Sequence, residues 1–187
     1  PTRKPGEITI GWGVSPDGMW SAIAIGAGVF DQPYVELFKH EEGDGLLHEE
    51  GVGWLPAELV RLTKKWQPKK IGCRATGPAA AQLASVMAAF RAAGLSTDVI
   101  HPYGTGEFAA ACGWALTAIV EGRLQRPAGQ EVLDLAVASA GARKTGDGFV
   151  WAPTDDMPIC SLDAITIAGH LLPVEVEHAL EPLFAVT

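Results

Sequence analysis

The residues of this sequence that could do chemistry are a few carboxylates far along the chain. Asp155 and Asp156 lie in a polar stretch, and Asp163 stands near the start of an apolar segment typical of a helix. Carboxylate oxygens are the ligands that Mg²⁺ and Mn²⁺ prefer. As an inward-facing acid, Asp163 is the best candidate. The plainer interpretations are a solvated loop pair for 155–156, and for Asp163 an exposed acid interacting with the helix dipole.

Other reactive side chains show no spacing that indicates a site. Asp17 belongs to Ser15-Pro16-Asp17-Gly18, which is typical of a turn, and its alternative role is that of a displaced metal ligand. The three cysteines are far apart and lack metal-finger spacing, so we expect reduced, buried thiols. The histidines are scattered and no two stand at metal-ligand spacing: His40, His48, His101, His170 and His178.

Composition indicates a globular chain of one domain. The 187 residues are 48% hydrophobic and 19% charged. A net charge of −8 argues against a broad basic surface for nucleic acid, although local contact is still possible. The densest basic stretch, 64–74, is expected to face water. No apolar run is long enough to span a bilayer, and no signal peptide opens the sequence.

The elements that must position these residues alternate between strands and helices. Residues 8–14, 19–29 and 33–39 predict three strands on short turns, which form an antiparallel meander. The remaining pattern predicts helices over 55–66, 79–93, 105–121, 130–143 and 162–172, strands over 70–73 and 97–101, and a hairpin over 144–151. Helical crossovers make the later strands parallel. We expect an α/β fold with a mixed sheet.

Four collinear stretches together resemble the C-terminal nuclease domain of phage terminase large subunits, the DNA-packaging motors of tailed phages. They are Gly11–Gly18, Arg74–Ala80, Gly104–Gly113 with 121–124 and 133–138, and Gly146–Trp151 with Ile159–Ala168. Within the family, the resemblance is nearest to terminases of actinobacterial phages and prophages. Each motif alone is weak, but the set covers nearly the whole chain and is fairly specific.

The resemblance implies a ribonuclease H-like fold: a mixed five-stranded sheet, an antiparallel meander plus two parallel strands, flanked by helices, with a late β-hairpin. It implies one nuclease domain over 1–187. The ATPase domain is expected to be absent from this chain, which has no Gly-x4-Gly-Lys-Ser/Thr phosphate loop. The implied partners are double-stranded DNA, the ATPase domain, the small terminase subunit and the portal. The implied location is the cytoplasm of the infected bacterium.

The implied activity is a metal-dependent endonuclease, a hydrolase that cuts concatemeric DNA with Mg²⁺ or Mn²⁺. Such chemistry uses two cations about 4 Å apart, one activating water and one stabilising the leaving oxygen. Two family carboxylates are replaced, by Gly13 and Arg74. The third aligns with Pro158, Cys160 or Asp163.

The surviving acids are then Asp163 and Asp156, with Asp17 as a further possible metal ligand. Arg74 either pairs with Asp163 in place of a cation or contacts a DNA phosphate. Arg143 and Lys144 lead into a hairpin that either borders the cleft and contacts DNA or is an ordinary surface hairpin.

Because two carboxylates are replaced, a second function competes with the nuclease. The chain could be a catalytically inactive ribonuclease H-like domain that guides DNA or contacts proteins. A third reading, an actin-like or sugar-kinase-like nucleotide binder, is disfavoured because the sequence has neither the acidic, Gly-rich hairpin nor the second copy of the fold that such proteins use.

Overall fold

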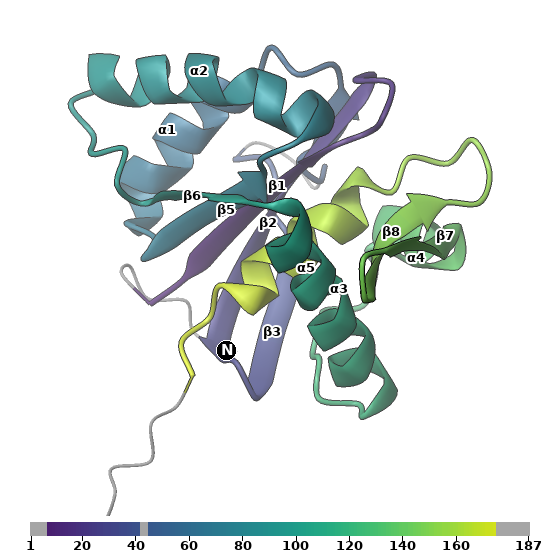
Figure 1. Ribbon diagram of the computed structural model, residues 1–187. Coiled ribbons are helices and arrows are strands. Elements are labelled where there is room, and N and C mark those ends of the chain that lie inside the picture. The colour runs from purple at the N-terminus through teal and green to yellow at the C-terminus, as the bar shows by residue number, and fades with distance from the viewer. Residues whose placement is uncertain (1–6, 42–44, 175–187) are drawn as a thin grey trace, which may run out of the picture.

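The computed structural model describes residues 7–41 and 45–174, which form a mixed sheet between two layers of helices (Figure 1). The main sheet has the strand order β3-β2-β1-β5-β6, and β4 pairs beside β2. Strands β1 to β3 are antiparallel, whereas β5 and β6 run parallel to β1. The strands are β1 (Thr9–Val14), β2 (Trp20–Val29), β3 (Gln32–Leu37), β4 (His48–Glu50), β5 (Lys70–Arg74) and β6 (Ile100–Tyr103).

Each face of the sheet has its own hydrophobic cluster. Helices α1 (Leu55–Trp66) and α2 (Gly77–Ala92) pack on one face, and α5 (Cys160–His170) and α3 (Thr105–Val120) cover the other. Beside α5 lie α4 (Glu131–Ala138) and the hairpin of β7 (Ala140–Thr145) and β8 (Gly148–Pro153). No helix in the described part of the chain is both long and apolar enough to cross a membrane.

Strand β1 carries large side chains on one face and small residues on the other. Residues i and i+2 of a strand share a face. Ile10, Trp12 and Val14 join the cluster under α1 and α2, while small residues, among them Gly11 and Gly13, face α5. Trp12 therefore lies on the face of the sheet opposite Gly13.

Helix α5 lies so close to the sheet that side chains are excluded between them. A Cβ atom on Gly11 would collide with the carbonyl oxygen of Ala164, and one on Gly26 with that of Ala168. The hydroxyl of Thr9 donates a 2.6 Å hydrogen bond to the same Ala168 oxygen. This close approach fixes the position of the helix that carries Asp163.

The mixed sheet flanked by helices is confirmed, but several elements differ from the sequence prediction. Strand β4 lies between the predicted 33–39 strand and the predicted 55–66 helix, where no element was expected, and β6 begins at Ile100 rather than 97. The predicted 130–143 helix ends at Ala138, because six residue pairs join β7 to β8.

Candidate functional site

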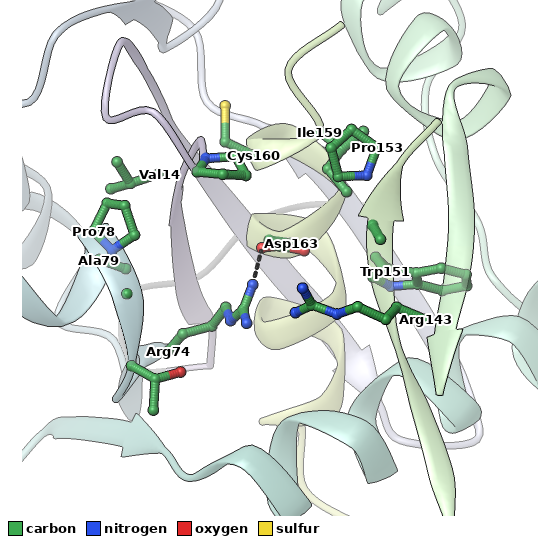
Figure 2. Close-up of a pocket in the computed structure, with 14 residues that line it drawn as sticks. Val14, Arg74, Pro78, Ala79, Arg143, Trp151, Pro153, Ile159, Cys160 and Asp163 are labelled. Carbon is green, nitrogen blue, oxygen red and sulfur yellow. Dashed lines mark hydrogen bonds and ion pairs between the residues drawn. The ribbon is translucent and has the colours of Figure 1, made fainter. Parts of the chain in front are cut away.

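A pocket of about 160 Å³ opens where β1 and β5 end and α5 begins (Figure 2). Its walls include Arg74 from β5, Asp163 from α5 and Arg143 from β7, together with the first residues of α2. Parallel strands of an α/β sheet gather their following loops at the carboxyl edge, which is where such folds bind ligands. Three segments far apart in the sequence therefore meet in one cavity.

Asp163 is the buried acid of this pocket. Every residue of α5 from Cys160 to Gly169 is buried, so an acid in its first turn has no solvent-facing side, and Asp163 is only 3% exposed. Its Oδ1 atom has no hydrogen-bond partner within residues 7–41 and 45–174. Burial raises the pKa of Asp163 to about 6, although the nearby Arg74 guanidinium acts in the opposite direction.

Arg74 is held between an acid and an aromatic ring. Its Nη1 donates to Oδ2 of Asp163 across 3.4 Å, and its guanidinium carbon lies 4.6 Å from the ring centroid of Phe108. Stacking on an aromatic face is favourable for arginine. The predicted pairing of Arg74 with Asp163 is confirmed. The role of Phe108 was not predicted, because it depends on how α3 packs.

Arg143 enters the pocket from the opposite wall. Figure 2 shows that the side chains of Arg143 and Arg74 enter from opposite sides and that both guanidinium groups are directed to the space beside Asp163. Within the described residues, no hydrogen bond or ion pair engages it. Successive strand residues point to opposite faces, and Lys144 accordingly does not line the pocket.

Gly13 adjoins the same cluster from β1. A Cβ atom on it would collide with the carbonyl oxygen of Cys160 and lie 3.2 Å from Cβ of Asp163. Real Cβ atoms do not approach a backbone atom so closely, so either the helix or the strand would have to move. A larger residue at position 13 is therefore incompatible with α5 in its present place.

The remaining predicted acids lie outside the pocket lining. Asp17 is exposed in its turn, where Oδ1 accepts hydrogen bonds from the Ser15 hydroxyl and the Met19 amide. These bonds lower the pKa of Asp17. Asp155 accepts a bond from the Met157 amide, and Asp156 is exposed beside it. The turn and loop interpretations describe these residues well.

No family model matches the chain, and no curated protein matches it. Solved structures do. The large terminase of bacteriophage HK97 aligns with a TM-score of 0.66 and 12% identity over 91% of this chain, which spans 40% of that protein. The nuclease of the large terminase from thermophilic phage G20c, with bound magnesium, gives 0.61 and 13% over 88% of this chain and 80% of that one.

A mutant nuclease domain of the large terminase subunit of bacterial virus Sf6, solved with manganese, gives a TM-score of 0.56 and 13% identity over 90% of both chains. This chain has the terminase nuclease fold. The predicted ribonuclease H-like arrangement is thereby confirmed, with β4 as an additional strand at the sheet edge. At these identities the likeness concerns the fold, and the chemistry must be judged from the pocket itself.

The donor set of the pocket does not fit two divalent cations. Among the residues that the structure describes, Asp163 is the only carboxylate in the lining, and the Arg74 guanidinium is already bound to it. In the described part of the chain, no three His, Cys, Asp or Glu side chains gather where they could hold a metal ion. A cation placed beside Arg74 would meet a like charge at close range. In this terminase nuclease fold, an ion pair stands where carboxylates are expected.

Proposed function

We propose that this chain is the nuclease-fold domain of a phage DNA-packaging large terminase, and that it holds double-stranded DNA without cutting it by a two-metal reaction. The terminase assignment is supported by the fold likeness, which covers 86–91% of the chain in every structure compared, and by the collinear motifs. The absence of cutting is supported by one observation: the single carboxylate that lines the pocket in the described part of the chain is paired with Arg74.

Two-metal cleavage would need several carboxylates converging on one phosphate. Asp155, Asp156 and Asp17 are the other acids that the sequence analysis considered for this purpose, and none of them lines the pocket. Asp17 is also committed to its turn by two hydrogen bonds. The inactive, DNA-holding alternative therefore agrees better with the geometry than the endonuclease does.

The partners and location follow from the same proposal. Such a domain works beside a terminase ATPase domain, the small terminase subunit and the portal, in the cytoplasm of the infected bacterium. The assignment of 1–187 as one nuclease-fold domain and the actinobacterial origin of the phage rest on the sequence motifs. Co-purification with a cognate ATPase domain on a portal ring tests the assembly part of the proposal.

The catalytic part is tested with the purified chain, plasmid DNA and Mn²⁺ or Mg²⁺. We expect no cleavage and no rise in melting temperature with metal, because a ligand stabilises only a protein that binds it. Asp163→Asn is the control: metal-dependent cutting that this variant abolishes would overturn the non-cleaving role. Fluorescence anisotropy with a labelled duplex tests DNA holding. We expect salt-sensitive binding, and no binding at low salt would refute it.

A further inference from the structure

We propose that the pocket binds a phosphate group directly, through Arg143, Arg74 and the first-turn amides of α2. This deepens the proposed function and rests on it for the source of the phosphate, a phosphodiester of double-stranded DNA. The chemistry recognised is that of phosphate in general, so free phosphate is a second possible source.

The first support is the charge of the pocket lining. It contains two arginines and one aspartate, and the aspartate is already paired with Arg74. Arg143 faces the same cavity with no acidic partner in the described residues. A guanidinium presents a planar fork of N–H donors that matches phosphate oxygens. An unpaired guanidinium directed into a cavity is arranged to receive an anion.

The second support is the orientation of Arg74. Phe108 covers one face of its guanidinium and Asp163 accepts one of its donors, so the group is held in one direction at 25% side-chain exposure. Guanidinium has five N–H donors, and this pairing uses one of them. The remaining donors stay available to a ligand. Pre-organisation of this kind reduces the entropy lost on binding.

The third support is the start of α2, which forms part of the pocket wall at Thr76, Gly77, Pro78 and Ala79. This 16-residue helix has no acidic side chain in its first turn and no side-chain cap. Its first amides therefore lack intrahelical partners and carry the positive end of the helix dipole. Pro78 has no N–H, which leaves the neighbouring amides to face an anion.

Asp163 does not prevent anion binding. It is 3% exposed, so it lies beneath the pocket surface, and Oδ2 accepts from Arg74. The net charge of the titratable lining residues is positive whether Asp163 is ionised or protonated. The cavity of about 160 Å³ is also far larger than the roughly 15 Å³ that a single water requires, so there is room for a phosphate group.

The test compares Arg143→Gln with Lys144→Gln. Both variants remove one positive charge from exposed, adjacent positions of β7, but only Arg143 lines the pocket. One probe is inorganic phosphate, followed by the rise in melting temperature against sodium chloride of matched ionic strength. The other is a labelled duplex, followed by anisotropy over a salt series.

We expect Arg143→Gln to abolish the phosphate-induced rise and to weaken duplex binding about tenfold, with a salt slope smaller by about one. Lys144→Gln should change both by less than twofold. If the two variants behave alike while the duplex still binds, the pocket is not the phosphate site, although DNA holding stands. If phosphate stabilises the wild type but not Arg143→Gln, and no duplex binds, the pocket is a phosphate site whose ligand is free phosphate. The DNA-holding role is then refuted.

Discussion

Replacing Gly13 by alanine should destabilise the protein, because the added methyl group has no space. Its Cβ atom would collide with the carbonyl oxygen of Cys160 and lie 3.0 Å from that carbonyl carbon. Both atoms belong to the helix backbone, which cannot rotate away as a flexible side chain can. The substitution therefore has to push α5 off β1.

The size of the effect follows from how α5 is fixed. Forcing a methyl group into a packed core typically costs 1–3 kcal/mol. Here the helix is also held at its other end by Thr9, whose hydroxyl binds Ala168, so tilting it would break further contacts. We expect a loss of roughly 3 kcal/mol in the free energy of unfolding. Gly113→Ala in α3, where nothing lies within 4 Å, should instead stabilise by roughly 0.5–1 kcal/mol.

Urea denaturation of both variants measures these changes, and the opposite signs make the comparison sharp. The double variant Gly13→Asp with Arg74→Asp extends it, because it restores the two expected acids. We expect this variant to be less stable and still inactive on plasmid with Mn²⁺, since α5 occupies the space that the new carboxylate needs. An alanine variant as stable as the wild type, or a double variant that gains metal-dependent cutting, would refute the reasoning.

Three further outcomes follow from other contacts. The pKa of Asp163 is raised from 3.8 to about 6, so its proton stabilises the fold below pH 4, and we expect about 3 kcal/mol to be lost as pH rises through 6. Subtracting the urea profile of Asp163→Asn isolates this loss, and a pH-independent difference contradicts it; besides burial, the group acting on Asp163 is Arg74. Thr9→Val removes a buried donor to Ala168 and should cost about 1–3 kcal/mol by urea denaturation, whereas a neutral result would show that the hydroxyl is dispensable. Burial raises the pKa of all three cysteines to about 12, so Ellman's reagent at pH 8 should label none in the native protein and three after denaturation.

Local pattern sufficed to predict most of the sheet. The strands predicted over 8–14, 19–29 and 33–39 are the clearest case, because the bounds of each lie within two residues of those in the structure. The pairing of Arg74 with Asp163 could also be predicted from the sequence, since opposite charges at two expected site positions suggest it. The burial of Asp163 was harder to predict from the sequence, because it depends on α5 being covered on every side.

The errors occur where tertiary partners override the local pattern. Helical periodicity continues from Val132 through Ala140, and nothing in that segment announces a strand. The helix ends there and a strand follows, because residues 140–145 form six antiparallel pairs with residues 148–153. This misassignment mattered for function, since it concealed that Arg143 and Lys144 alternate across a β-ribbon. In a helix, the two side chains would differ by only about 100 degrees in direction around the axis, and they would not point to opposite faces.

Gly13 and Arg74 act together on the surroundings of Asp163 in this structure. Removing the side chain at position 13 lets α5 settle onto β1, and this approach buries Asp163 almost completely. A buried carboxylate without a cation is costly unless another positive charge compensates it. Arg74 supplies that charge from the adjacent strand at 3.4 Å. With the guanidinium in place we expect the pocket to favour anions, and metal binding there would require the helix, the glycine and the arginine to change together.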